Sequence, residues 1–393
     1  MTSLDNALVT ETLNLFEGGP LHRVMLWLGL AGCSRRQITR RILFWVMLLW
    51  LPPFALAALD SIGATHSPTV SVFTDLPFHI RYLLSAPILI AAECHLGQLL
   101  SGVIPILVAR DMILPQSMQA FIKMASRIRG LRNSNGAEFI LLLGSLAFVA
   151  SRAYLDLPQE ISSWRQSNSI LGTVARIWEL KIGLTAYYFL ILRWIWKFLI
   201  WSYFLIRLAI LKPNLQSHHP DHAGGLSFLV YRHLWFGLVA FALSAAISAN
   251  IGEIVIFSKV SVSTFLFPLI FYLVFIEILL IAPLLCFTPL LVISRRNGLD
   301  RYGTFANRYA GDFDRKWVEP DPGETPEALG SPDIQSFNDL GETYVHLREM
   351  QSFVMKREHV VTLTILISAP LAPLILFKIP VSEFIKIAAK LIA

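Results

Sequence analysis

The densest group of chemically versatile side chains is a short polar turn, His218-His219-Pro220-Asp221-His222, which Gly224 and Gly225 follow closely. Imidazole nitrogens and carboxylate oxygens are zinc ligands, so the turn predicts a candidate zinc site made by His218, His219, Asp221 and His222. The alternative is structural: Asp221 caps the next helix, and the two glycines let the backbone turn tightly. A third interpretation is an anion-binding turn in which backbone N–H groups at Gly224 and Gly225 hold the ligand.

Ionisable residues inside apolar runs form the second candidate group. An ionisable side chain is costly in a bilayer and is by default a functional hypothesis. The pattern predicts a path for an ion or polar solute, lined by Glu93, His95, Glu277, Arg193, Lys197 and Arg232. Two alternatives stay open, namely ion pairs between helices, such as Glu93 or Glu277 with Arg193, and snorkelling of Arg193 and Lys197 to an interface. Residues two apart on a helix diverge by about 200°, so Glu93 and His95 are not expected to face one pore.

The elements that would position these residues are long apolar runs. The chain has 393 residues, of which 55% are hydrophobic and 15% are charged, whereas soluble domains carry about 25% charged residues. A run of about twenty apolar residues can cross a bilayer as a helix. We therefore expect an all-α polytopic membrane helix bundle with about seven transmembrane helices, at 42–59, 80–100, 137–156, 182–206, 226–249, 263–293 and 360–378.

Four regions follow from this pattern. They are a cytoplasmic N-terminal segment (1–41) with an interfacial helix near 20–34, a membrane domain with spans one to six (42–294), a cytoplasmic helical hairpin (295–358), and a last span with an amphipathic C-terminal tail (359–393). Residues 109–136 predict a second helix on the membrane surface, and Trp164 and Trp178 predict interfacial anchors.

The distribution of Lys and Arg predicts the orientation. The segments 1–41, 109–136, 205–225 and 295–358 hold 21 Lys and Arg, against 7 in the segments 60–81, 157–181, 250–262 and 379–393. This bias places the first group in the cytoplasm, with the N-terminus inside and the C-terminus outside. The net charge of +6 thus reflects topology and predicts no nucleic-acid partner. The first residues lack the basic start of a cleavable signal peptide, so the first span should act as an uncleaved anchor.

The three cysteines, Cys33, Cys94 and Cys286, are far apart and lie in or beside apolar stretches. They match no metal-ligand or disulfide pattern, so we expect them to be small buried apolar residues.

The segment 295–358 predicts two amphipathic helices. One carries aromatic residues three or four positions apart, from Tyr302 to Trp317, and the other carries a stripe from Phe337 to Leu347. Between them, Glu319 to Gly330 is rich in helix breakers, and Ser331-Pro332-Asp333 has the composition of a helix start. The hairpin either joins the last two spans or provides a contact surface or oligomer interface.

Three stretches resemble a family of uncharacterised bacterial multi-pass inner-membrane proteins: HPDHAGGL (219–226), LGSPDIQSFNDLGE (329–342) and RRNGLDRYGTFANRYAGDFDRKW (295–317). The resemblance covers most of the chain from the fourth span onward and implies no activity. Where the family pattern often has Arg, this chain has His222, which weakens the case for His222 as an obligatory metal ligand.

These observations favour an integral protein of the bacterial inner membrane that acts as a channel or transporter for a small ion or polar solute. The alternative is a non-transporting sensor or assembly scaffold that acts through the hairpin. The chain has no HExxH, Walker-type, GxSxG or paired CxxC motif, so we predict no enzyme. Zinc is the one cofactor considered, and the predicted partners are the lipid bilayer, a small solute and further copies of the chain.

Overall fold

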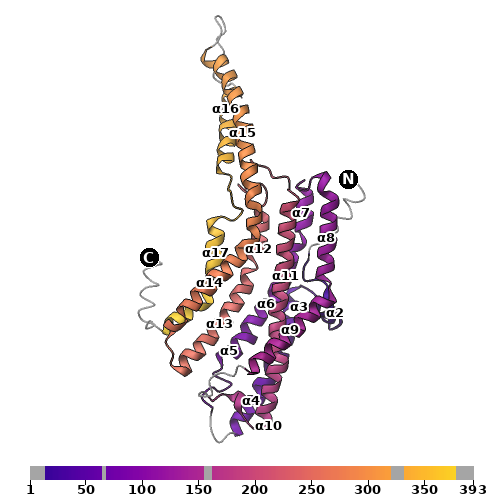
Figure 1. The fold of residues 1–393 in the computed structure, drawn as a ribbon, viewed down its shortest axis with the longest axis vertical. Coiled ribbons are helices and arrows are strands. Elements are labelled where there is room, and N and C mark those ends of the chain that lie inside the picture. The colour runs from indigo at the N-terminus through magenta and orange to yellow at the C-terminus, as the bar shows by residue number, and fades with distance from the viewer. Residues whose placement is uncertain (1–13, 64–67, 155–161, 320–331, 378–393) are drawn as a thin grey trace.

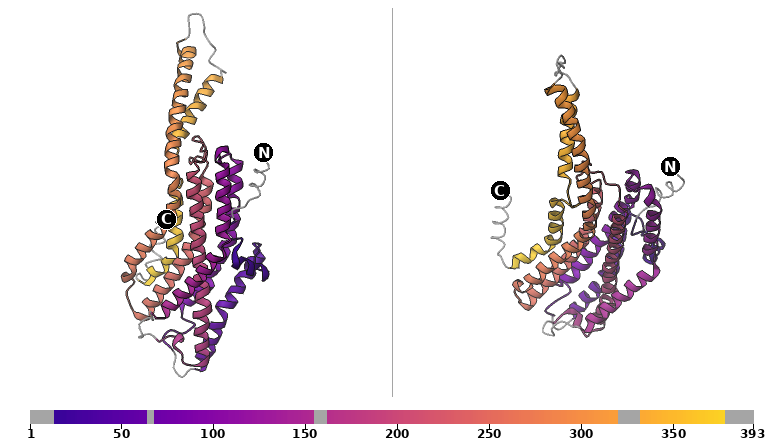
Figure 2. Two further views of the ribbon diagram at one scale, coloured as in Figure 1. Left: turned by 45° about the vertical axis from the view of Figure 1, so that its right-hand side comes forward. Right: turned by 45° about the horizontal axis from the view of Figure 1, so that its top comes forward.

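The computed structural model describes residues 14–63, 68–154, 162–319 and 332–377. These residues form helices joined by turns, with an isolated bridge between Val70 and Ser163. The all-α prediction is therefore confirmed. Figure 1 shows an elongated helix bundle with a two-helix hairpin projecting from one end, and Figure 2 shows the same projection in two further views. We call the opposite end of the bundle the foot.

Six helical stretches are long and apolar enough to cross a membrane, or seven if one bent pair counts as a span. Each stretch contains several elements, whose bounds are as follows: α3 (Arg35–Leu49) and α4 (Leu51–Gly63); α5 (Leu76–His79), η1 (Ile80–Ser85), α6 (Ala86–Ser101) and α7 (Val103–Ala109); α10 (Ile170–Trp178), η4 (Glu179–Leu184) and α11 (Thr185–Ile210); α12 (Ser227–Leu234) and α13 (Gly237–Ser258); η5 (Val262–Phe265), α14 (Leu266–Ile281), η6 (Ala282–Phe287), α15 (Thr288–Phe313) and η7 (Asp314–Val318); α17 (Arg357–Ser368) and η8 (Ala369–Phe377).

The bent pair corresponds to the predicted surface helix (109–136) and the predicted third span (137–156). It comprises η2 (Pro115–Ser117) with α8 (Met118–Arg132), followed by α9 (Asn135–Tyr154), and the two halves meet at 43°. The apolar side of α8, with Phe121 and Ile128, is buried in the main core, and α8 rises beside the end of α11 (Figure 1). Hence α8 packs against protein, whereas a helix lying on the membrane was expected.

The predicted N-terminal interfacial helix corresponds to α2 (Gly19–Trp27). It exposes Val24, Leu26 and Trp27, and Trp27 is 85% exposed. Such an apolar face suits a helix at a membrane surface.

Prolines account for several irregular stretches within the spans. A Pro ring removes a backbone N–H and clashes with the preceding turn. Pro283 opens the 3-10 segment η6, and Pro373 lies inside the 3-10 segment η8. By contrast, η1 and η4 are π-helical turns without proline.

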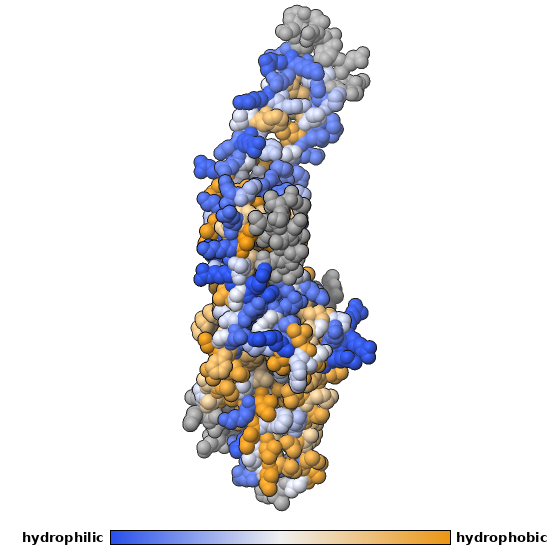
Figure 3. All heavy atoms as spheres, turned by 90° about the vertical axis from the view of Figure 1, so that its right-hand side faces the viewer, coloured by the Kyte–Doolittle hydropathy of each residue, from blue (hydrophilic) through white to orange (hydrophobic). Residues whose placement is uncertain are grey.

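The outer surface of the bundle is strongly apolar. Phe267 and Phe271 of α14 are 80% and 64% exposed, and in Figure 3 hydrophobic residues cover the part of the bundle toward the foot, whereas hydrophilic residues cover the hairpin. Large apolar surfaces of this kind are not tolerated in water. The apolar helices therefore indicate an integral membrane protein.

The hairpin consists of α15 with η7 and of α16 (Pro332–Glu349), which lie antiparallel. The ring of Phe337 stacks on Tyr309 and Phe313, with the centroids of Phe313 and Phe337 4.8 Å apart. The aromatic stripe is thus half-buried between the two helices, while Phe305 is 55% exposed. The predicted breaker region beyond Glu319 and the helix-start Ser331 fall within 320–331, and the predicted amphipathic tail falls within 378–393. Both lie outside the described residues.

Two further predictions are wrong. Cys33 and Cys94 form a disulfide, with their Cα atoms 5.3 Å apart, because α3 packs on α6 and brings these distant positions together. Trp164 was expected to be an interfacial anchor. It is 4% exposed and its Nε1–H donates a hydrogen bond to Asp75, so it is a core residue.

Candidate functional site

A buried ion network surrounds Glu93 in the middle of the bundle. Glu93 is 1% exposed, and its two carboxylate oxygens accept hydrogen bonds from Arg193 of α11 and Arg41 of α3. Arg193 also contacts Glu138 of α9, with 3.4 Å between Nε and Oε1. A buried carboxylate is tolerated when it is paired and hydrogen-bonded in this way. The alternative interpretation from the sequence, an ion pair between helices formed by Glu93 and Arg193, is therefore confirmed.

Glu138 extends this network to the N-terminal part of the described chain. Its Oε2 accepts the backbone N–H of Leu21 at 2.8 Å, near the start of α2, where a negative charge complements the helix dipole. Gly19 approaches the same carboxylate so closely that a Cβ there would lie 2.5 Å from Oε1. Helices α2, α3, α6, α9 and α11 thus meet at one group of charges.

Lys197 lies one turn beyond Arg193 on α11 and is 0% exposed. Its Nζ donates to the backbone carbonyl of Arg132 at 3.5 Å. Since both cations are enclosed by protein, the snorkelling alternative does not describe them.

The other predicted path residues lie in separate local contacts. His95 points to the opposite side of α6 from Glu93 and packs against Trp235, with ring centroids 4.0 Å apart. Glu277 of α14 accepts a hydrogen bond from Thr364 of α17 at 2.6 Å. Arg232 donates to the carbonyl of Leu99 at 2.8 Å and also to the carbonyl of Phe228. The structure brings together Glu93, Arg193 and Lys197, but it distributes the remaining three elsewhere.

A second buried ion network, which the sequence did not predict, lies toward the foot. Asp75 and Glu179 have fully buried side chains, and Arg165 bridges them with distances of 2.6 Å to both carboxylates. Asp75 also accepts hydrogen bonds from Trp164 Nε1 at 2.9 Å and from the N–H of Phe78 at 2.8 Å. Burial alone raises the pKa of Asp75, but Arg165 and these two donors outweigh it and hold the pKa below its usual value.

The two π-helical turns pack together at this network. Arg81 of η1 contacts Glu179 of η4 at 3.4 Å, and a Cβ on Gly183 would lie 2.5 Å from the hydroxyl of Tyr82. Turns of π-helix are rare and recur at functional positions. The contact between these two turns therefore marks a candidate site, which the periodicity of the sequence could not reveal.

The polar turn before α12 is organised by Asp221. Its carboxylate accepts the N–H groups of Ala223, Gly225 and Ser227 at 2.9 to 3.1 Å. Burial raises the pKa of Asp221, but these three N–H groups and the adjacent His219 outweigh that effect and lower it. Gly224 and Gly225 have φ values of +64° and +92°, which glycine adopts without strain. The N-cap position of α12 is Leu226, which has no side-chain cap. Asp221 instead holds the preceding turn and accepts the N–H of Ser227, the first residue of α12, and an added anion would compete with its carboxylate for the N–H of Gly225.

The four predicted zinc ligands of this turn do not converge. His219 contacts Asp221, and His218 faces the hydroxyl of Tyr302 with 3.2 Å between Nδ1 and the oxygen. His222 has a φ of +56° and points instead to α16, where its ring centroid lies 5.6 Å from that of His346. Among the described residues, His222, His346 and Glu349 form a group whose ligand atoms all lie within 4.8 Å of one another.

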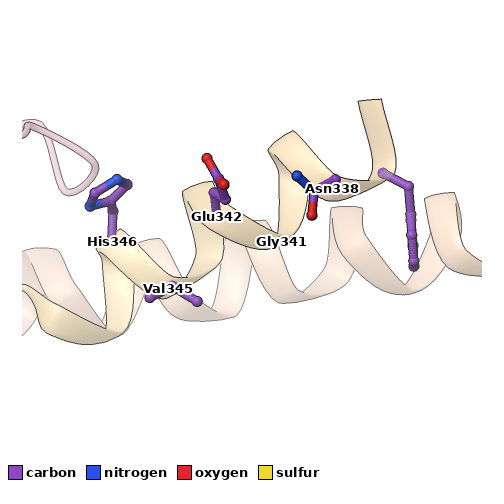
Figure 4. A pocket seen from close by; sticks show the side chains of 6 residues that line it. Asn338, Gly341, Glu342, Val345 and His346 are labelled. Carbon is purple, nitrogen blue, oxygen red and sulfur yellow. The ribbon is translucent and has the colours of Figure 1, made fainter. Parts of the chain in front are cut away.

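A shallow hollow runs along α16 beside this group. It has a volume of about 450 Å³ and is lined by Phe337, Asn338, Gly341, Glu342, Val345 and His346. Figure 4 shows Asn338, Glu342 and His346 on one side of the helix, with His346 nearest to the loop and Val345 directed away. The exposed side of α16 therefore carries polar groups, of which His346 lies nearest to the loop.

Comparison with known proteins adds no assignment. No family model matches the chain, and neither a curated protein nor a solved structure is significantly similar to it. The resemblance drawn from the three sequence stretches thus stays a prediction, and the function has to be argued from the contacts above.

Proposed function

We propose that the chain is a non-transporting membrane protein that assembles as a dimer through its projecting hairpin and serves as a membrane-anchored scaffold. The observation that carries this proposal is the contrast in exposure between the central carboxylate and the hairpin. Glu93 is enclosed by Arg41 and Arg193, which supports a structural role. Val345 and Ile334 of α16, by contrast, are 50% and 46% exposed.

One face of the hairpin suits close contact with another helix pair. At about 100° per residue, Ile334, Gly341 and Val345 fall on one side of α16, while Gly311 and Val318, seven positions apart, share one side of α15. A Cβ added at Gly311 or Gly341 would meet nothing within 4 Å. Small residues on an open helix face allow two backbones to approach, so we call Ile334, Gly341 and Val345 the docking face.

The charges of the two helices favour a second copy as the occupant. The stretch Thr288–Val318 holds six Lys and Arg and three Asp, whereas Pro332–Glu349 holds four acidic residues and one Arg. Both copies are anchored in one bilayer, so their two-fold axis runs along the length of the bundle. When the docking faces of two copies meet, this symmetry places the basic helix of each copy beside the acidic helix of the other.

The register of the hairpin strengthens this pairing. Phe313 lies opposite Phe337, and Arg295 donates to the carbonyl of Arg348 at 2.7 Å. The contact between Phe313 and Phe337 puts Arg308 and Arg315, seven positions apart, level with Glu342 and Gln335, which are also seven apart. Spacings of seven are those of helices that pair along their length.

Cross-linking between two differently tagged copies tests the proposal. One copy carries Asn307→Cys and the other Gly341→Cys, two level positions on the docking side of α15 and α16. The matched control pair is Asp312→Cys with Asp339→Cys, which are level but on the opposite side. All four positions are exposed, and the unsubstituted chain reports the background from Cys286.

We expect oxidation in native membranes to give a mixed dimer from the first pair and little from the control pair. Equal cross-linking of both pairs, or none from the first, would contradict dimerisation through this face.

A further inference from the structure

The base of the hairpin carries three metal-ligating side chains that come from two separate parts of the chain. His346 and Glu349 are three residues apart on α16, which places them on one helix face. His222 belongs to the turn before α12, more than 120 positions earlier in the sequence. Their ligand atoms lie within 4.8 Å of one another.

The turn holds His222 firmly in this position. Its backbone carbonyl accepts the N–H of Gln351 at 2.8 Å, and the preceding residue, Asp221, fixes the turn through three backbone N–H groups. The left-handed conformation at His222 is uncommon for a residue with a side chain. The imidazole is therefore directed at α16 by its backbone.

An independent observation points to a ligand at this position. The Nδ1 atom of His222 is buried and has no hydrogen-bond partner among the described residues. A buried polar atom without a partner costs about 1–3 kcal/mol, and a coordinated cation would remove this cost. His346 and Glu349 are exposed, so both can rotate toward the bound ion.

We propose that His222, His346 and Glu349 bind a divalent transition-metal cation of the zinc class. Two imidazole nitrogens and one carboxylate oxygen are a donor set for such ions, with a fourth position left for water. Tetrahedral zinc holds its ligands at about 2.0–2.2 Å, so binding draws the three side chains inward. The bound ion ties the base of the hairpin to the turn before α12 and limits its swing against the bundle. This proposal does not depend on dimerisation.

Titration of the tag-free, detergent-purified protein with ZnCl₂ tests the site. The unmodified chain is expected to bind one Zn²⁺ per copy, and MgCl₂ in excess is not expected to compete, because Mg²⁺ prefers oxygen ligands. His346→Ala and Glu349→Gln should weaken binding at least roughly tenfold, since even outer-shell partners are worth about 10–100-fold. His222→Asn tests the third ligand with a residue that tolerates the left-handed conformation.

His218→Ala is the matched control, because it removes an imidazole from the same turn that lies outside the group. It should bind Zn²⁺ as the unmodified chain does, and bound zinc should slow tryptic cleavage after Arg348 except in the His346→Ala variant. The proposal is overturned if the unmodified chain binds no Zn²⁺, or if His346→Ala and Glu349→Gln both bind it unchanged. For a variant that still binds an ion, the absorption spectrum of bound cobalt(II) reports whether that ion retains nitrogen ligands.

Discussion

The network around Glu93 and the base of the hairpin use similar residue types in opposite ways. In the bundle, Glu93 and Glu138 are almost fully enclosed and contact cations from neighbouring helices. At the hairpin, His346 and Glu349 are exposed, and His222 has a buried nitrogen without a partner. In the first region the charged groups bind one another and hold helices together. In the second region the imidazole and carboxylate groups remain available to bind a ligand such as a metal ion.

The largest expected effect tests whether the bundle network is structural. Glu93→Gln leaves Arg41 and Arg193 buried without their counter-charge, and breaking a buried ion pair in this way costs about 3–5 kcal/mol. We expect a loss of about 4 kcal/mol in the free energy of unfolding, measured by thermal or denaturant unfolding in detergent.

Glu277→Gln is the matched control for that measurement. Among the described residues, Glu277 accepts its hydrogen bond from the neutral Thr364, and an amide oxygen can accept the same hydrogen bond, so the loss in Glu277→Gln should stay below about 1 kcal/mol. If both variants lose the same free energy of unfolding, burial does not distinguish Glu93 from Glu277, and the structural role of the Glu93 network is contradicted.

The sequence predicted the apolar spans because a bilayer-length run of nonpolar residues has few alternatives. It also predicted that Glu93 and His95 diverge, since helical geometry alone fixes this. It could not predict Glu138 as a partner of Arg193, or the disulfide between Cys33 and Cys94, because both depend on which helices become neighbours. Periodicity describes one helix at a time and contains no distances between helices.

The metal-ligating group shows the same limit at the hairpin. The turn was recognised by its three histidines, but only His222 joins the group, because Asp221 holds His219 and Tyr302 faces His218. The partners, His346 and Glu349, have the spacing of a helical ligand pair. That spacing was a usable signal, but nothing in the sequence linked it to a turn so far away.

The second prediction extends the comparison to the foot, where the buried network includes a group just outside the spans. Asp75→Asn removes the charge that faces Arg165 and should cost about 2 kcal/mol, within the range of about 1.5–3 kcal/mol for hydrogen bonds to charged groups. Unfolding of the variant in detergent at neutral pH measures this loss.

The same residue gives a pH dependence with a defined sign. The pKa of Asp75 in the folded protein lies below its usual value, which is about 3.9 in the unfolded chain. Its contribution is therefore complete above about pH 5, about one unit above the unfolded pKa, and is lost as the pH falls toward and through the lowered pKa. The unmodified protein should lose more stability than Asp75→Asn between pH 6 and pH 3; equal losses would count against this assignment.

A smaller effect is expected at the turn before α12, which lies between the two regions. Asp221→Ala removes the acceptor of three backbone N–H groups and should cost about 1 kcal/mol, as for loss of a helix cap. It should also weaken Zn²⁺ binding, because the turn no longer fixes His222. His218→Ala should change neither quantity, and a variant of Asp221 with unchanged zinc affinity would show that His222 is positioned by other contacts.

The smallest expected effect concerns the exposed charges of the hairpin, and it sharpens the comparison because no buried group is involved. Arg308 and Glu342 are exposed and level with each other in the register of α15 and α16, so in the proposed dimer Arg308 on the basic helix of one copy stands at the height of Glu342 on the acidic helix of the other. Exposed ion pairs contribute about 0.2–1 kcal/mol, so Arg308→Glu or Glu342→Arg should weaken dimerisation by no more than about fivefold for each of the two symmetry-related pairs. The double variant restores opposite charges between copies and should recover the affinity, measured by fluorescence energy transfer between labelled copies in lipid vesicles. If the two single effects simply add in the double variant, then these charges do not face each other and the hairpins pair in another register.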